Sequence, residues 1–403
     1  MMITNMKKKP IELYIHIPFC VKKCDYCDFL SFRALSSVHE AYVQQLIREI
    51  RAQSCYCTDC QVVSVFIGGG TPSLLEPSCI SRIMETVFSC FQVEPEAEIT
   101  IEANPGTLLG KKLPVYRQCG INRVSIGLQS ADNTELKNLG RIHSFEEFLK
   151  SFQSARMAGF TNINIDLMSG IPGQTLESWK NTLKKVTMLK PEHISAYSLI
   201  IEEGTPFWNR FGEGACACDY TGPALPDEDT ENKIYRFTRK FLQEQGFERY
   251  EISNYAKPGK ECRHNIGYWT EVAYLGLGLG ASSYMEGCRF TNEKDLDKYL
   301  ALDFGEEDPE KRETALRKLW GQIEELSQAQ RMEEFMFLGL RMLKGVSDVD
   351  FVRLFGVKME TVYGAVIERL MANGLLKKEG VWLSLTEWGM DVSNFVLSEF
   401  LLG

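Results

Sequence analysis

Six short runs rich in β-branched residues recur along the first half of the 403-residue chain. Stretches with helical periodicity lie between them, and the one at 144–159 begins with an N-cap serine and closes near a glycine. Strands that alternate with helices in this way predict βαβ units and a parallel sheet. Six units predict an α/β fold built on a partial (βα)6 barrel. The predicted strands are 12–19, 62–70, 98–106, 123–130, 162–173 and 193–201.

Polar or glycine-rich residues lie at the end of every predicted strand. In a barrel of parallel strands, the active site is built from the loops at the carboxyl ends of the strands. Side chains that follow different strands are therefore expected to meet at one shared site. In chain order these residues are Cys20, the run 68–72, Glu102, Asn104, Gln129, Asp166 and Tyr197.

Beyond residue 203 the pattern is less regular. A loop rich in glycine, proline and acidic residues is predicted over 203–230, and a charged helix over 304–328. From about residue 330, helices with a short hairpin resemble a winged helix, but no basic stripe accompanies them, which favours a structural or protein-contacting lid over DNA binding. We predict a barrel core over 1–203, an α+β barrel extension over 204–303 and a C-terminal winged-helix-like domain over 304–403.

Composition places the chain among ordinary globular proteins, with 44% hydrophobic and 25% charged residues. No apolar run approaches the roughly 20 residues that cross a bilayer, so no transmembrane segment is expected. The interrupted N-terminal run lacks a cleavage site, which indicates a first strand rather than a signal peptide and predicts a cytoplasmic location. A net charge of −9 argues against nucleic acid as the main partner and fits a monomer or a homodimer alike.

Three of the 13 cysteines, Cys20, Cys24 and Cys27, lie within eight residues directly after the first predicted strand. A structural zinc site takes four ligands, whereas three thiolates can hold three irons of a 4Fe–4S cluster and leave the fourth iron open. The alternatives are three free thiols or a zinc site completed from elsewhere. Two further groups are expected to be solvent-side thiols, with adventitious metal binding as the alternative: Cys55, Cys57 and Cys60, and Cys216 and Cys218.

The segment "CVKKCDYC" at 20–27, followed by "GGGTP" at 68–72, resembles the radical S-adenosylmethionine (SAM) superfamily. This resemblance implies a 4Fe–4S cluster whose open iron chelates the amino and carboxylate groups of SAM. Reductive cleavage of SAM then gives a 5′-deoxyadenosyl radical in that superfamily. Glycines at 68–70 would let the backbone approach the amino end of SAM, because any other residue would occupy that space.

The resemblance extends to the coproporphyrinogen dehydrogenase-like branch, whose SAM contacts have counterparts in order along this chain. Taken singly, each counterpart could instead cap a loop or lie on the surface. The implied set is Tyr14 before the first cluster cysteine, Gly69, Gly70 and Thr71 for the amino group, Glu102 and Gln129 for the amino and ribose groups, Arg141 for the carboxylate and Asp166 for the ribose.

Two members of that branch differ at positions that can be checked here. HemN enzymes carry a further cysteine where this chain has Phe29, and they have a longer segment before the cluster. The segment "HNIGYW" at 264–269 fits the HNxxYW motif of the HemW heme chaperones. This similarity implies heme near His264, since imidazole is a common axial ligand, with Cys262 as an alternative ligand. A histidine beside two aromatic residues is otherwise typical of a packed core.

The resemblance implies a heme chaperone that binds heme and hands it to a client such as a respiratory hemoprotein. Whether SAM is cleaved, and thus whether the protein is an enzyme, stays open. The alternative is an oxygen-independent coproporphyrinogen III dehydrogenase, and Phe29 argues against it. A third interpretation, a structural metal protein with a nucleic-acid-binding tail, conflicts with the acidic charge.

Overall fold

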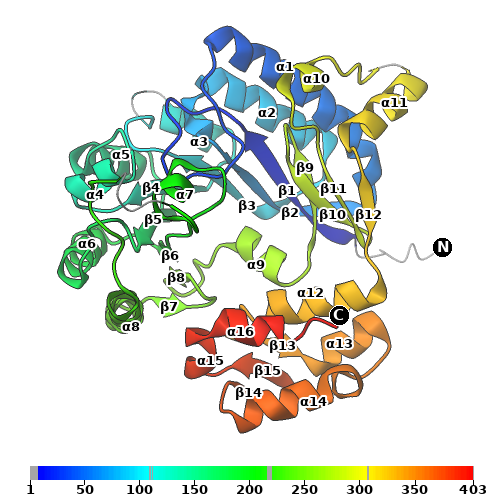
Figure 1. The fold of residues 1–403 in the computed structure, drawn as a ribbon. Coiled ribbons are helices and arrows are strands. Elements are labelled where there is room, and N and C mark those ends of the chain that lie inside the picture. The colour runs from blue at the N-terminus through cyan, green and yellow to red at the C-terminus, as the bar shows by residue number, and fades with distance from the viewer. Residues whose placement is uncertain (1–7, 109, 111, 216–219, 306–307, 403) are drawn as a thin grey trace.

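The computed structural model describes residues 8–108, 110, 112–215, 220–305 and 308–402 (Figure 1). It contains all the strands predicted in the first half, and every neighbouring pair among them is parallel. The predicted α/β fold with a parallel partial barrel is therefore confirmed. These strands are β1 (Lys9–Ile17), β2 (Cys60–Gly69), β3 (Val93–Ala103), β4 (Arg123–Gln129), β5 (Ile163–Ser169) and β6 (His193–Ser198).

Helices cover the outer face of this sheet because alternate residues of each strand are apolar. Ile11, Leu13 and Ile15 of β1 are fully buried and share one hydrophobic core with Leu46 and Ile50 of the first helix. Such burial contributes about 1.5–3 kcal/mol for each aliphatic side chain. The helices are α1 (Ser36–Gln53), α2 (Pro77–Cys90), α3 (Lys112–Gln118), α4 (Asn133–Asn138), α5 (Phe145–Met157) and α6 (Leu176–Met188).

The middle of the chain extends the sheet at both edges. In its described residues, the predicted loop over 203–230 contains the short helix α7 (Pro206–Phe211), which Thr205 caps and which has Pro206 in its first turn, and the first residues of α8 (Glu228–Glu244). The elements after these are β7 (Glu248–Arg249), β8 (Asn254–Ala256), α9 (Arg263–Trp269), β9 (Ala273–Leu277), β10 (Ser282–Met285), β11 (Cys288–Thr291), α10 (Leu296–Leu300), α11 (Pro309–Leu319) and β12 (Ile323–Glu325). The full sheet has the order β12-β11-β10-β9-β1-β2-β3-β4-β5-β6-β8-β7.

A second hydrophobic core begins at Met332 and includes Met336, Phe351 and Tyr363. It belongs to α12 (Gln328–Gly339), β13 (Val346–Ser347), α13 (Asp348–Phe355), α14 (Met359–Ala372), β14 (Leu376–Glu379), β15 (Trp382–Leu385), α15 (Glu387–Asp391) and α16 (Ser393–Ser398). The predicted helix over 304–328 is instead α11 and β12, and α11 packs into the first core through Leu316 and Leu319. The boundaries at 203 and 303 stay a prediction.

The inner face of the barrel is polar where the outer face is apolar. On β4, Val124 and Ile126 belong to the core, whereas Ser125 and Gln129 line a cavity. In Figure 1, α9 lies inside the curve of the sheet, between the barrel and the C-terminal elements. Within the described ranges, every helix is too short or too polar to cross a membrane.

Candidate functional site

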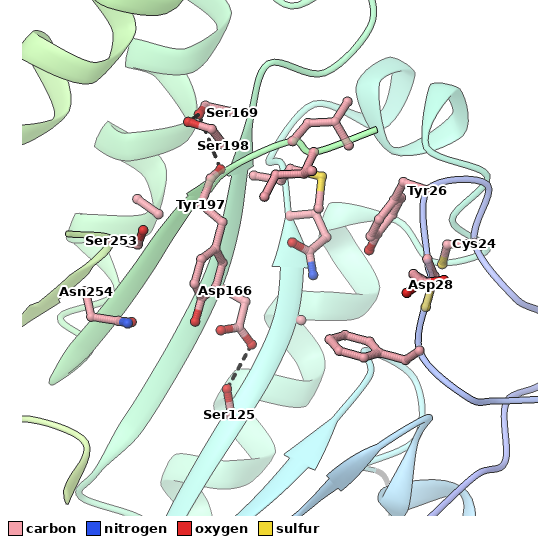
Figure 2. A pocket seen from close by; sticks show the side chains of 18 of the residues that line it. Cys24, Tyr26, Asp28, Ser125, Asp166, Ser169, Tyr197, Ser198, Ser253 and Asn254 are labelled. Carbon is pink, nitrogen blue, oxygen red and sulfur yellow. Dashed lines mark hydrogen bonds between the residues drawn. The ribbon is translucent and has the colours of Figure 1, made fainter. Parts of the chain in front are cut away.

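A cavity of about 880 Å³ opens at the carboxyl ends of β1–β6. It brings together nine of the residues implied for the cluster and SAM, and it also includes Asn104 and Tyr197 from the predicted strand ends. Figure 2 shows Cys24, Tyr26 and Asp28 of the loop after β1 on one side, opposite Asp166 and Tyr197 on the other. The nine predicted residues in its lining are Cys20, Cys24, Cys27, Gly69, Gly70, Glu102, Gln129, Arg141 and Asp166.

The loop after β1 holds the three cysteines with partly exposed thiols. The backbone N–H of Cys20 donates to Phe32 O at 3.0 Å, and the Cys20 Sγ lies 3.4 Å from the Thr71 hydroxyl. Arg141 Nη1 donates to the Cys24 Sγ at 3.6 Å. These contacts hold Cys20 and Cys24 at the wall of the cavity and place the Arg141 guanidinium beside the Cys24 sulfur.

The three cysteines line one cavity and offer it soft sulfur ligands. Across the described part of the chain, no three histidine, cysteine or acidic side chains gather closely enough to hold a single metal ion. A four-iron cube attaches its thiolates at separate corners, so it needs them further apart than one zinc ion does. Three thiols are the donor set that the cluster implied by the motif takes, and its binding by Cys20, Cys24 and Cys27 stays a prediction.

The glycines after β2 are required by the packing of the protein itself. Gly69 has φ +110°, and a Cβ on it would lie 2.5 Å from the ring of His16. A Cβ on Gly70 would lie 2.7 Å from the carbonyl oxygen of Phe19. Side chains are thus excluded here even before a ligand is considered, and the free backbone faces the cavity.

Two carboxyl groups lie on the cavity wall formed by β3 and β5. Glu102 Oε2 accepts the backbone N–H of Gly69 at 3.0 Å. Asp166 accepts hydrogen bonds from Ser125 Oγ at 2.8 Å and Asn164 Nδ2 at 2.7 Å. Burial, with a contribution from Asp166, raises the pKa of Glu102 to about 8. A cationic or hydrogen-bond-donating ligand would restore the charged form, so this wall suits an amino group or ribose hydroxyls.

Arg141 spans the floor between β3 and β4. Its Nη2 donates to Asn104 Oδ1 at 2.8 Å and to the Gly127 carbonyl oxygen at 2.5 Å. Its Nε is buried and has no hydrogen-bond partner among the described residues. Two hydrogen bonds fix the guanidinium beside the cysteines, and its Nε–H is left to donate, so Arg141 is suited to binding a carboxylate.

Three predicted residues lie outside this cavity. Tyr14 lines a neighbouring cavity, and Thr71 is buried behind Cys20, where it also accepts a hydrogen bond from Asn104 Nδ2 at 2.8 Å.

The third of these residues, His264, is 1% exposed, with Nδ1 2.8 Å from Ser64 Oγ and Nε2 3.0 Å from the Tyr268 hydroxyl. Burial, together with Arg123, lowers the pKa of His264 to about 3. The imidazole is neutral and both nitrogens are occupied, so heme contact by His264 stays a prediction. Cys262 is fully buried.

The other cysteines lie away from the cavity. Cys55 is exposed, while Cys57 and Cys60 are buried before and at the start of β2, at the opposite end of the strand from Gly69. Cys216 and Cys218 lie outside the described residues.

The cavity also includes residues that were not predicted from the sequence: Arg341, Ser393 and Asn394 from the C-terminal elements. The sequence carries no local signal that these residues approach the barrel.

The fold and the cysteine loop define a radical SAM protein. Residues 14–186 match the model of the Radical SAM superfamily, and residues 326–392 match the HemN C-terminal domain. The superfamily implies a 4Fe–4S cluster and SAM. The solved structure of coproporphyrinogen III oxidase (HemN) from Escherichia coli has the same fold, with a TM-score of 0.81 at 24% identity over 98% of this chain and 91% of that one.

Relatives named heme chaperone HemW align over nearly the whole chain. The protein from Lactococcus lactis is 36% identical over 98% of this chain and 99% of the relative. That from Escherichia coli is 34% identical over 98% and 99%, and that from Bacillus subtilis 33% over 96% and 98%. The chain belongs to the HemW family.

Proposed function

We propose that the protein binds heme and delivers it to client hemoproteins, respiratory ones among them, while it holds SAM on a 4Fe–4S cluster. The observation that carries this proposal is the nearly full-length similarity to relatives named heme chaperones. The HNIGYW segment supports it, because Tyr268 and Trp269 at the end of α9 line the cavity that contains the cysteines. The cytoplasmic location and the oligomeric state stay predictions.

For the cofactors, we propose that Cys20, Cys24 and Cys27 bind the cluster. Backbone at Gly69 and Gly70 would face the amino end of SAM. For the other residues we propose roles that the resemblance implies and the cavity lining supports: Glu102 for the amino group, Arg141 for the carboxylate, and Gln129 and Asp166 for the ribose. Thr71 would support Cys20. When bound, the cluster supplies an electron for reductive cleavage of SAM, and heme handling does not require that step.

The raised pKa of Glu102 predicts that SAM binds more tightly as the pH rises. Below about pH 8 Glu102 is protonated, and it must lose its proton to face the SAM amino group as a carboxylate, the stronger acceptor. The affinity for SAM is therefore expected to fall by up to about tenfold for each pH unit below that value. The amino group of SAM titrates in the same range. Calorimetry should therefore measure the affinity for SAM as a function of pH in wild type and in Glu102→Gln, and compare the two slopes. Equal slopes would show that Glu102 does not contact SAM.

Heme uptake tests the proposed function directly. We expect cluster-loaded wild type to take up heme stoichiometrically in an anaerobic titration followed by absorbance, and to pass it to an apo-hemoprotein. His264→Ala should weaken uptake about tenfold, because Tyr268 then loses the partner that orients its ring. His39→Ala is the matched control and should bind as wild type does, because His39 is a partly buried histidine whose ring lies tilted against Phe19. If wild type takes up no heme, the delivery proposal fails.

The alternative, decarboxylation of coproporphyrinogen III, stays a prediction with its own test. The position where HemN enzymes carry a further cysteine is Phe29, which is 69% exposed and lines the cavity. Production of 5′-deoxyadenosine and protoporphyrinogen from SAM and coproporphyrinogen III would favour the enzyme. We expect none.

A further inference from the structure

A second cavity, of about 400 Å³, lies on the same inner face of the sheet, over β1, β9 and β10. Its walls are the phenol rings of Tyr14, Tyr274 and Tyr284, and α12 closes one side through Leu338. We call it the aromatic cavity. Neither the cysteines nor the residues proposed for SAM line it, apart from Tyr14.

The rings around the aromatic cavity form a continuous series. Tyr268 meets Tyr274 edge-on, with ring centroids 4.7 Å apart, and Tyr274 lies 6.3 Å from Tyr284. A wall of rings favours a flat, conjugated ligand, because such a ligand gains both apolar burial and ring contacts.

Polar groups at the rim lack partners within the protein. Trp269 Nε1 and Glu271 Oε1 are shielded from solvent, and neither has a hydrogen-bond partner in the described ranges. An unpaired buried group costs about 1–3 kcal/mol. Glu271 also has φ +56°, a conformation that non-glycine residues rarely adopt. Burial raises the pKa of Glu271 to about 7, so near neutral pH its carboxyl can donate as well as accept.

A guanidinium completes the rim. Arg289 pairs with Glu334 through both terminal nitrogens, at 2.7 and 2.9 Å, and keeps further N–H groups for another acceptor. Trp269 N–H, Arg289 and a protonated Glu271 are donors around one opening. Together they suit the carboxylate side chains of a flat ligand.

A thin wall separates the two cavities. Phe29, Tyr268 and Trp269 line both of them. A ligand in the aromatic cavity would therefore lie beside the SAM site without entering it.

We infer that the aromatic cavity is the heme site, with the porphyrin against the tyrosine rings and its propionates toward Trp269 and Arg289. This inference rests on the proposed function and locates its cargo. We call the cavity of about 880 Å³ that contains the cysteines the cofactor cavity. The inference also assigns Phe29 the role of keeping the porphyrin apart from the cofactor cavity. His264 then acts as a positioning residue, through Tyr268.

Two serine-to-tryptophan variants test this location as a matched pair. Ser282 is an exposed residue of β10 that lines the aromatic cavity, and Ser198 is an exposed residue of β6 that lines the cofactor cavity. We expect Ser282→Trp to weaken heme binding at least tenfold and leave SAM binding unchanged. Ser198→Trp should weaken SAM binding and leave heme binding unchanged. Heme and SAM are titrated separately into cluster-loaded protein.

The outcomes separate the inference from the proposed function. If wild type binds heme and Ser282→Trp binds it equally well, the location is wrong while the chaperone proposal stands. If Ser198→Trp alone loses heme, the porphyrin lies in the cofactor cavity. Should Ser282→Trp fail to fold, Tyr274→Leu removes one ring while keeping bulk, and unchanged heme affinity in that variant would equally overturn the inference. If wild type binds no heme, it is the proposed function that fails.

Discussion

Cys24→Ser is expected to reduce bound iron and sulfide to background and to abolish SAM binding. A serine hydroxyl is a poor ligand for iron in a cluster, and two thiolates hold the remaining irons weakly. Cys24 is also the residue whose sulfur accepts a hydrogen bond from Arg141, so its loss removes that contact. Iron and sulfide content after anaerobic reconstitution, with calorimetry of SAM, measures both effects.

Cys55→Ser is the matched control, because Cys55 is an exposed thiol in the other cysteine cluster. It should retain the full iron content. A variant pair in which Cys55→Ser loses iron and Cys24→Ser keeps it would place the cluster elsewhere.

Gly69→Ala is expected to lower the free energy of unfolding by about 2–4 kcal/mol and to abolish SAM binding. The new methyl group would lie 2.5 Å from the ring of His16. That ring has little freedom to move, because Nδ1 is 3.0 Å from the Tyr14 hydroxyl and Nε2 is 2.8 Å from the Leu30 carbonyl oxygen. Chemical denaturation of the cluster-free protein measures the stability, and calorimetry of the reconstituted protein measures SAM.

Gly106→Ala separates the clash from the backbone cost. Gly106 also has positive φ, +84°, but no described atom lies within 4 Å of the position of its Cβ. It should lose only about 1–2 kcal/mol, the cost of that conformation, and keep SAM binding. Equal losses in the two variants would show that the contact with His16 is unimportant.

The barrel was predictable because its signal is local. Each strand carries its own alternation, as in Ile11, Leu13 and Ile15 of β1, and each helix carries its own cap, as Ser144 does for α5. The end of a parallel strand also has a known direction, so residues such as Glu102 and Asp166 could be expected at one site before any coordinates were known. Alternation would further have revealed Ser125, which shares the inner face with Gln129.

The rest of the site depends on contacts between distant parts of the chain. Arg341 reaches the cofactor cavity only because α12 packs beside α9, and its guanidinium lies 4.5 Å from the ring of Trp269. The aromatic cavity likewise joins β1 to β9 and β10, more than 250 residues later. The hydrogen bond between His264 and Ser64 was equally hidden, since Ser64 lies 200 positions away.

The polar inner face of the barrel has a consequence for how such proteins diversify. Odd and even positions of one strand have separate roles. One set packs against the surrounding helices, and the other lines the cavities and forms hydrogen bonds within their walls. Exchanges at Ser125 or Tyr14 would leave Val124 and Leu13 undisturbed in the core. A scaffold of this kind can therefore change the ligand it carries through substitutions at alternate positions of its strands, while the core residues that specify the fold stay the same.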